Sequence, residues 1–596
     1  MANRMKKINL GITLLAVILT FISCGDFLTC NPKDTVTDTP DFWNSEDNIR
    51  TAVLDIYTNF FVGYNEGWNR SDYFSETNIA DWNDDNAQEA ATFFTKVAPA
   101  SASGSNWNFT LVRHINVMLN RVKSSTLDDE AKNHWMGVLR FFRALEYSQL
   151  VNLYGDVPYY EEALDNKDYA GLYRARDKRT DVMDKVLDDL NFASQNIRIS
   201  NGEAGLTVNR DVADAYGSRL MLFEGTWEKY REQNTEYAKK YLEAAKVFAE
   251  AVMNSGRYHL CNNFLDLTTS ESLAGNPEII LYRSYAEGVV THSLMSFQNT
   301  LIEVDSPSKS LVDSYLSKNG LPIHQSDNTL SRGDKWFPDE MADRDPRLYA
   351  NVDTTGLKLN GIADVYATSG YFSHLFVNES LKDKAGGQSY TCITDAPIMR
   401  YDEVLMNYIE TAAELSTLGD YTLTQQDFDK TINILRDRPS TSMPHVTLAG
   451  NTLQVNGINI NDPDRDSDVP SILWEIRRER RDELPYSGIR FYDIRRWGKL
   501  QYADMVKNPK VNMGAWLDKD KYVAWYNSRH PGTTITIDNL SKIKLDRDGN
   551  AGYIKPITDQ NLMRISSDKD YLYPIPEDQI TLYKSRGYTL TQNPGW

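Results

Sequence analysis

Apolar side chains recur at helical spacing through much of the chain, and this pattern predicts a mainly helical protein. Over residues 131–153, Trp135, Val138 and Phe142 belong to a stripe that follows one face of a helix, and Gly155 provides a stop. A first helix is predicted to follow Ser45, a plausible N-cap. Comparable periodicity predicts further helices at about 109–122, 180–196, 209–230, 235–254, 401–418, 425–437 and 469–484.

Four of these segments form two pairs, 209–230 with 235–254 and 401–418 with 425–437. Small residues such as Ala245 on the inner face let two helices approach closely, which is typical of tetratricopeptide-type repeats. No clean 34-residue signature is present, so any repeats are degenerate. The predicted fold class is mainly α, with a tetratricopeptide-like helix-pair scaffold.

Long stretches between the helices lack any period and are rich in Pro, Gly, Asn, Asp and Tyr. They cover residues 256–400, 439–468 and 500–596, and a shorter one covers 64–108. Loops of such length are uncommon unless they are functional or form a second layer. We therefore expect large irregular, loop-rich insertions on the helical scaffold.

The N-terminus has the features of an export signal. Basic residues precede an apolar run at residues 8–22, which is shorter than the approximately 20 residues of a membrane span. The run ends at Ser23-Cys24-Gly25, which resembles a lipobox. We predict a signal peptide at residues 1–23, lipidation of Cys24 and a lipidated tether at 24–44, so that the protein is attached to a membrane without crossing it.

Composition excludes several classes of protein. The 596 residues are 41% hydrophobic and 25% charged, as expected of a folded chain. With 83 acidic and 64 basic residues, the formal net charge is −19. Such a chain repels polyanions, so no nucleic-acid partner is predicted.

No motif for nucleotide, zinc or serine-nucleophile chemistry is present, so no catalytic residue, metal ligand or cofactor is predicted. Two acidic stretches, 461–468 and 546–550, resemble calcium ligands but lack the EF-hand glutamate in register. Solvated turns are the favoured interpretation, with calcium as the alternative. A glycosidase needs only two carboxylates, and spacing in the sequence leaves that possibility open.

Arginine and acidic residues alternate between Trp474 and Lys499, including the run Arg477–Arg481. This interleaving predicts an ion-pair network that holds a helix against its neighbours, in preference to a phosphate-binding patch.

The same region carries a resemblance to a known family. Residues 474–484 and 488–498 resemble the "I-x-x-E-R-x-x-E-L" and "G-x-R-x-x-D-L-x-R-W-G" blocks of the SusD/RagB family, which are surface nutrient-binding lipoproteins of glycan-foraging Gram-negative bacteria. Further similar blocks follow the family's order at residues 24–28, 143–147, 155–158, 400–408, 572–576 and 592–596. The resemblance therefore covers the whole mature chain.

This resemblance implies a single SusD-like domain at 45–596, with an N-terminal part at about 45–255 and a C-terminal part at about 256–596. It implies four tetratricopeptide-like helix pairs, no enzymatic activity and an oligosaccharide ligand. It also implies location at the surface of the outer membrane and a SusC-like TonB-dependent transporter as partner. Two alternatives stay open: a surface α-helical glycoside hydrolase that uses two carboxylates, and a SusD-like binder of peptide or another nutrient.

A sugar-binding site requires an exposed aromatic ring beside polar side chains. The densest such cluster is Asp81-Trp82-Asn83-Asp84, where no apolar neighbour in the sequence would draw Trp82 inward. We predict that Trp82 stacks on a sugar ring while Asp81, Asn83 and Asp84 bind hydroxyls, with Trp68 at the flank. A second zone at 283–336 contributes three further candidates: Arg283, Tyr285 and Trp336.

Overall fold

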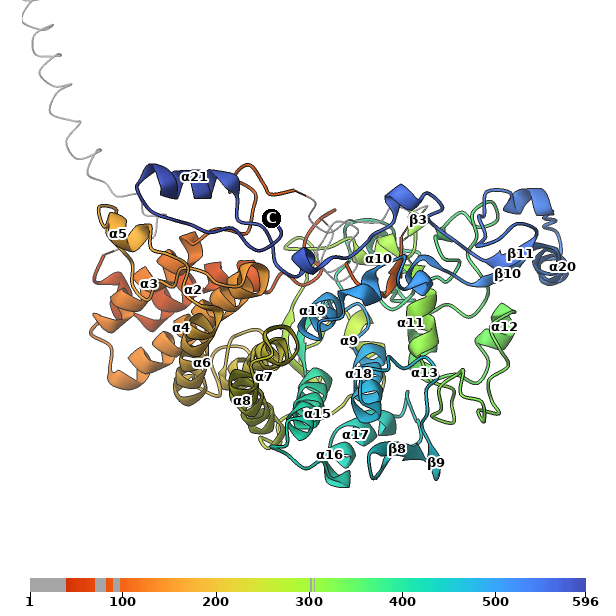
Figure 1. The fold of residues 1–596 in the computed structure, drawn as a ribbon, viewed down its shortest axis with the longest axis horizontal. Coiled ribbons are helices and arrows are strands. Elements are labelled where there is room, and N and C mark those ends of the chain that lie inside the picture. Colours follow the sequence, from red (N-terminus) through yellow and green to blue (C-terminus); the bar gives the residue numbers. More distant parts are fainter. Residues whose placement is uncertain (1–38, 70–81, 89–96, 301–302, 305) are drawn as a thin grey trace, which may run out of the picture.

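The regular structure is mainly helical, and long irregular segments join the helices (Figure 1). The computed structural model describes residues 39–69, 82–88, 97–300, 303–304 and 306–596. The predicted signal peptide, Cys24 and Asp81 lie outside the described residues. The mainly α, tetratricopeptide-like scaffold with large irregular insertions is confirmed.

The long helices agree with the predicted segments to within a few residues at each end. They are α2 (Glu46–Phe60), α3 (Thr110–Lys123), α4 (Asp129–Tyr154), α6 (Arg179–Asn196), α7 (Arg210–Trp227), α8 (Thr235–Met253), α15 (Tyr401–Thr417) and α18 (Ser471–Glu483). The prediction of one helix at 425–437 is wrong. Two short helices occupy this segment, α16 (Gln425–Asp429) and α17 (Ile432–Asp437).

Local chemistry fixes the ends of α4 and the spacing between α7 and α8. The Asp128 carboxylate accepts a hydrogen bond from Ala131 N at 2.9 Å, which caps the start of α4. Gly217 and Gly225 of α7 lie so close to α8 that a side chain at either position would not fit. A Cβ at Gly225 would lie 2.9 Å from the backbone nitrogen of Leu242. These glycines allow the close antiparallel packing that the small residues predict.

Short strands pair within the irregular segments and produce five small sheets among the described residues. The one nearest the helical scaffold joins β2 (Ile279–Arg283) to β6 (Ala396–Arg400) in antiparallel register. The others pair β1 (Asn86–Ala87) with β4 (Ser306–Pro307), β3 (Glu303–Val304) with β5 (Tyr366–Ala367), β10 (Trp516–Asp518) with β11 (Ala551–Tyr553), and β7 (Thr447–Ala449) with β8 (Thr452–Val455) and β9 (Ile458–Asn459).

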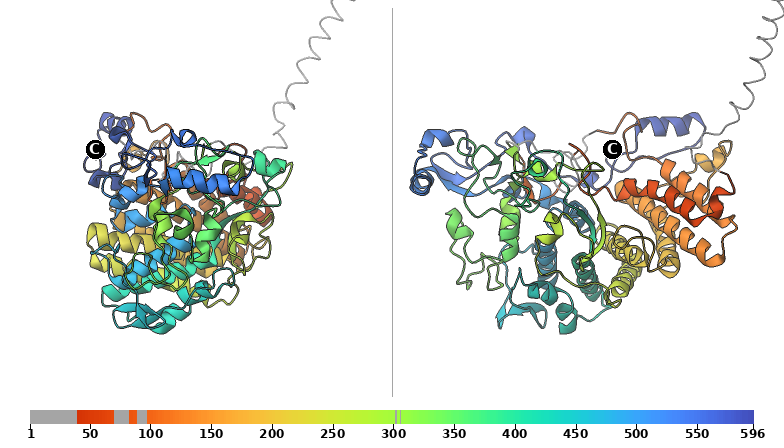
Figure 2. Two further views of the ribbon diagram at one scale, coloured as in Figure 1. Left: turned by 90° about the vertical axis from the view of Figure 1, so that its right-hand side faces the viewer. Right: turned by 180° about the vertical axis from the view of Figure 1, so that it is seen from behind.

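The C-terminal segment returns to the N-terminal helices, so the two ends of the domain are joined. Helix α21 (Glu577–Ser585) lies at the same end of the molecule as α2 and α3 (Figures 1 and 2). Tyr573 N donates to the carbonyl of Leu153 at 2.7 Å, and the Asn593 amide donates to the carbonyl of Tyr154 at 3.0 Å.

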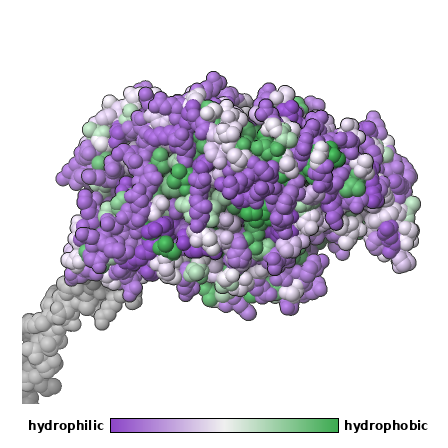
Figure 3. All heavy atoms as spheres, turned by 90° about the horizontal axis from the view of Figure 1, so that it is seen from below, coloured by the Kyte–Doolittle hydropathy of each residue, from purple (hydrophilic) through white to green (hydrophobic). Residues whose placement is uncertain are grey.

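The surface seen from below is mainly hydrophilic, with separate small hydrophobic patches (Figure 3). Among the described helices, none is both long enough and apolar enough to cross a membrane.

Helix α18 is held by buried ion pairs, as its alternating charges predict. Arg480 binds Asp493 at 2.8 Å, and Arg496, on α19 (Arg490–Arg496), binds both Glu410 at 2.6 Å and Asp493 at 2.8 Å. All four side chains are almost fully buried. Because a buried charge is costly without its partner, each pair depends on both members.

Arg496→Met should therefore destabilise the fold by about 3–5 kcal/mol in chemical denaturation, because Glu410 would remain buried and charged. Adding Glu410→Gln should recover part of this loss. The neutral amide removes the buried charge and can still accept the hydrogen bond that Trp497 Nε1 donates at 2.7 Å. Unchanged stability with lost ligand binding would instead place Arg496 in a binding site.

A buried glutamate lies in the π-helical turn that follows α7 and precedes α8. Glu228 begins this turn, Glu228–Glu232, and is 1% exposed. Among the described residues, neither of its carboxylate oxygens has a hydrogen-bond partner. Burial, with a further contribution from the charge of Glu224, raises the pKa of Glu228 to about 8. The folded protein therefore holds this proton at a pH where the unfolded chain has released it.

Stability should consequently fall as the pH rises from the ordinary carboxyl pKa of 4.5 towards about 8. Glu228→Gln should be more stable than wild type by roughly 2 kcal/mol or more at about pH 9, and similar to it at about pH 4. Urea denaturation at both pH values measures the difference. A stability difference that does not change with pH would contradict the assignment.

Candidate functional site

Two exposed aromatic rings lie together on the surface. Trp68 is 52% exposed and Tyr390 is 45% exposed, and their ring centroids are 5.4 Å apart with the planes inclined at 59°. Phe297 contacts Trp68 edge-on, with the centroids at 6.5 Å. Large aromatic side chains seldom remain this exposed without a partner, so the Trp68–Tyr390 surface is a candidate binding platform.

Arg283 and Tyr285 hold the loop that carries Trp68. The Arg283 guanidinium donates to the carbonyl of Val62, and the Tyr285 hydroxyl donates to the carbonyl of Asn65 at 2.8 Å. The structure thus brings three predicted site residues into one region. Tyr285 is only 5% exposed, however, so its ring supports the loop from beneath and is not itself an exposed stacking surface.

The cluster around Trp82 differs from the expected open site. Trp82 is partly buried, with its ring centroid 5.7 Å from that of Phe491 and 6.0 Å from that of Tyr573. Asn83 and Asp84 are 7% and 2% exposed. The expectation that no apolar neighbour draws Trp82 inward is therefore wrong, because its apolar neighbours come from distant parts of the sequence.

Trp336 lies in a different environment. Its ring contacts Trp525 edge-on, with the centroids at 6.0 Å, and Lys521 Nζ lies 4.0 Å from its centroid. Both partners belong to α20 (Lys519–Arg529). None of the ring contacts of Trp336 within the described chain involves the Trp68 loop, so the second predicted zone is divided between two places.

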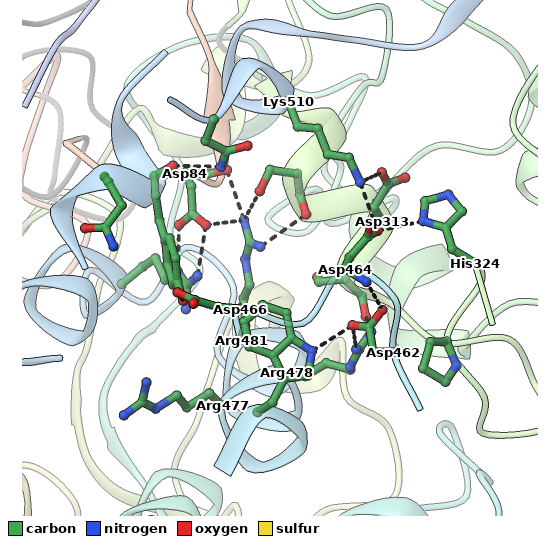
Figure 4. Close-up of a pocket in the computed structure, with 18 of the residues that line it drawn as sticks. Asp84, Asp313, His324, Asp462, Asp464, Asp466, Arg477, Arg478, Arg481 and Lys510 are labelled. Carbon is green, nitrogen blue, oxygen red and sulfur yellow. Dashed lines mark hydrogen bonds and ion pairs between the residues drawn. The ribbon is translucent and has the colours of Figure 1, made fainter. Parts of the chain in front are cut away.

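A hollow of about 370 Å³ lies between α18, the short helix α11 (Lys309–Ser314) and the acidic segment 461–466 (Figure 4). Residues 490–510 complete its wall. Charged and aromatic side chains dominate the lining, which includes Asp84, Asp313, His324, Asp462, Asp464, Asp466, Trp474, Arg477, Arg478, Arg481, Arg490, Trp497, Gln501, Tyr502, Lys507, Asn508 and Lys510. Asp84 is thus the predicted site residue that reaches this pocket.

The acids in the wall are stabilised as carboxylates. Asp84 accepts two hydrogen bonds from Arg490, at 2.7 and 2.9 Å, and pairs with Arg481 at 3.2 Å. Burial alone would raise the pKa of Asp84, but the two guanidinium groups outweigh it and lower the pKa to about 2. The neighbouring cations Lys309 and Lys510 likewise outweigh burial and lower the pKa of Asp313 to about 2.

The two acidic stretches that resemble calcium sites use their carboxylates internally. Asp462 pairs with Arg478 and also accepts from Trp474, while Asp464 accepts from His324 at 2.6 Å. In the second stretch, Asp546 pairs with Arg547 at 2.6 Å. Asp462, Asp464 and Asp546 are therefore bonded to side chains of the protein, and the side chain of Asp462 is too buried for the solvated turn that was expected. Calcium binding stays an alternative for either stretch.

One buried group of carboxylates, Glu278, Asp402 and Glu483, is close enough to hold a metal ion among the described residues. Arg438 already bridges two of them, with nitrogens 2.6 Å from Glu278 and 2.5 Å from Glu483. A guanidinium group therefore occupies the position between these carboxylates, which assigns the group to the ion-pair network.

Sequence reasoning missed Tyr390 and the aromatic wall of the pocket. Tyr390 follows Gly386-Gly387-Gln388-Ser389, where nothing in the pattern distinguishes it from a loop tyrosine. Trp474 and Tyr502 lie in or near blocks that were interpreted as scaffold. The only available signal was the acidic segment 461–466, which lies opposite α18 in the pocket.

Comparison with known proteins identifies the family. The SusD family matches residues 277–596, which is more than half of the chain, and the family described as "Starch-binding associating with outer membrane" matches residues 27–222. The chain belongs to the SusD family.

Two SusD-like proteins of Formosa agariphila are similar in sequence. One is 27% identical over 201 residues, or 31% of this chain and 37% of the relative. The other is 24% identical over 391 residues, or 62% of this chain and 66% of the relative. This SusD-family chain thus matches less than two thirds of the length of either relative.

Solved structures share the fold over nearly the whole chain. A SusD-like carbohydrate binding protein from Bacteroides fragilis is 22% identical, with a TM-score of 0.64 over 91% of this chain and 99% of that one. Surface glycan-binding protein A from Bacteroides fluxus is 16% identical, with a TM-score of 0.56 over 93% and 100% of the two chains. At these identities the likeness establishes the SusD-type fold.

Trp82→Ala should lower stability by about 2 kcal/mol, because a partly buried indole would be removed from contact with Phe491 and Tyr573. Trp68→Ala is the matched control and should change stability by about 0.5 kcal/mol or less, since that indole is half exposed. Thermal and urea denaturation measure both. A Trp82→Ala variant of unchanged stability that no longer binds ligand would restore the stacking role of Trp82.

Proposed function

We propose that this SusD-family protein is a non-catalytic cell-surface lipoprotein that binds an oligosaccharide and delivers it to a SusC-like TonB-dependent transporter in the outer membrane. Family membership supports the general role. The basic and apolar N-terminal residues and the lipobox at Cys24 support export and lipid attachment. Several acyl chains would hold the protein stably at the membrane, whereas a single chain binds weakly.

The observation that carries the proposal is the exposed pair formed by Trp68 and Tyr390. The CH face of a sugar ring packs well on an aromatic face. Two rings inclined at 59° present faces in different planes, which suits consecutive sugar units that are not coplanar. The supporting bonds from Arg283 and Tyr285 hold the loop before ligand arrives, so less conformational entropy is lost on binding.

The pKa values of acidic side chains in the pocket support a binding role in preference to hydrolysis of a glycosidic bond. A glycosidase of the common type needs one carboxylic acid whose pKa is raised so that it can protonate the leaving group. In the pocket, the pKa values of Asp84 and Asp313 are lowered to about 2, and those of Asp464 and Asp466 are also lowered. These four carboxylates are therefore suited to accept hydrogen bonds and poorly suited to donate a proton.

Trp68→Ala and Tyr390→Ala should each weaken binding of oligosaccharides longer than a disaccharide by about 2 kcal/mol, or roughly thirty-fold, because each removes a stacking surface. Isothermal titration calorimetry against a panel of neutral oligosaccharides measures the affinity. Tyr169→Ala is the matched control, because Tyr169 is 49% exposed on the short helix α5 (Tyr169–Leu172) and contacts Tyr173 instead.

Unchanged affinity in both platform variants would contradict the assignment of the site. New reducing ends released by the wild-type protein would contradict the non-catalytic role. Binding of short peptides in place of every oligosaccharide would favour the peptide-nutrient alternative.

A further inference from the structure

The pocket beside α18 has the features of a second, partly open binding site, separate from the Trp68–Tyr390 surface. Neither Trp68 nor Tyr390 belongs to its lining. Its volume of about 370 Å³ is at the small end of the range of roughly 300–1,000 Å³ for ligand sites, so it suits a short ligand or the end of a chain.

Two aromatic rings in the pocket are held by their polar tips. Trp474 Nε1 donates to Asp462 at 2.7 Å, and the Tyr502 hydroxyl donates to Asp466 at 2.7 Å. Both acceptors belong to the segment 461–466, and both rings remain partly exposed. Because the polar atoms are already bonded, the ring surfaces that line the pocket are left for apolar contact with a ligand.

Hydrogen-bonding capacity remains unused in the wall. The side-chain amide of Gln501, which is partly exposed, makes no hydrogen bond within the described chain. The Asn508 amide nitrogen donates to the carbonyl of Tyr502, which leaves the Asn508 oxygen as a further acceptor.

Charge balance in the pocket selects the kind of ligand. Asp464 Oδ2 lies 3.0 Å from Lys510 and 2.6 Å from His324, and Asp466 lies 2.8 Å from Lys499 (Figure 4 shows the first two contacts). Every acidic side chain in the lining is paired in this way with a cation. An ionic ligand would add an uncompensated charge or break a pair, whereas hydroxyl groups can both donate and accept without adding charge.

We propose that this pocket binds the terminal one or two units of a neutral oligosaccharide, with Trp474 and Tyr502 as apolar contacts and the Gln501 amide as a hydrogen-bonding group. The inference rests on the proposed glycan binding and adds a second site to it.

The test compares variants that alter the pocket with a variant that alters the Trp68–Tyr390 surface. Gln501→Trp places a bulky side chain at the pocket wall, and Gln501→Ala removes only the amide. Gln426→Trp, at an exposed position on α16, is the matched control. Calorimetry on the purified proteins would use neutral oligosaccharides of two to eight units, with acidic oligosaccharides and tripeptides in parallel, and thermal melting would confirm that each variant is folded.

Gln501→Trp should weaken binding of the disaccharides by about tenfold or more, and Gln501→Ala by a smaller factor, while Trp68→Ala leaves disaccharide affinity within about threefold. The pocket proposal would be overturned if Gln501→Trp and Gln501→Ala both bound disaccharides as tightly as wild type while longer chains still bound through Trp68. That result would leave the proposed function intact. Tighter binding of acidic oligosaccharides or tripeptides in the pocket would also overturn it. Absence of binding of any oligosaccharide to wild type would instead overturn the proposed function.

Discussion

Buried arginine–carboxylate pairs around α18 are the interactions on which the rest of the structure depends. One end of this helix is joined through Glu479 and Glu483 to Arg347, which lies 2.8 Å from both carboxylates. Arg438 extends the same network to Glu278, and Arg477 reaches Glu414 of α15. Segments that are separated by hundreds of residues are thus tied to one helix by charge-assisted bonds with specific geometry.

This arrangement explains how a chain with so few strands keeps long irregular segments in place. Backbone pairing in the insertions is limited to strands of two to five residues. Side-chain pairs supply the missing constraint. Arg481 donates to Asp85 at 2.8 Å and to the carbonyl of Asp84 at 2.9 Å. These bonds hold the segment 82–88, which contains β1, against α18. A buried ion pair adds little net stability, because removing its two charges from water is costly. Its main effect here is to favour one arrangement of these loops over the others.

The sequence predicts best where a pattern is local. The continuous apolar stripe of α4 and its Gly155 stop lie within one stretch of chain, so its limits are predicted to within two residues. The break between α16 and α17 is not visible in the periodicity. There the Thr431 hydroxyl donates to the carbonyl of Asp427, and a non-helical conformation at Thr431 separates the two helices. Side chain–backbone bonds of this kind compete with helix formation.

Prediction of the site fails wherever the neighbours are distant in the sequence. Trp82 is surrounded by polar residues along the chain, yet Phe491 and Tyr573 contact its ring in space. The alternation of charge in Arg477–Arg481 correctly predicts paired arginines, but it does not name Glu414, Asp462 or Asp493 as partners. Trp68 is exposed, as its polar surroundings in the sequence predict, whereas nothing in the sequence around Tyr390 distinguishes that residue.

Two arginines belong both to the ion-pair network of α18 and to the lining of the pocket. Arg478 and Arg481 hold α18 in place and also line the hollow, so substitutions of these two would disturb both folding and the pocket. Gln501, by contrast, makes no side-chain bond to the described scaffold. The loop of Trp68 is likewise attached through backbone carbonyls, which any residue would provide. Ligand preference can therefore change at such positions without loss of the ion-pair network, and the charged motif would persist while the residues that contact ligand vary.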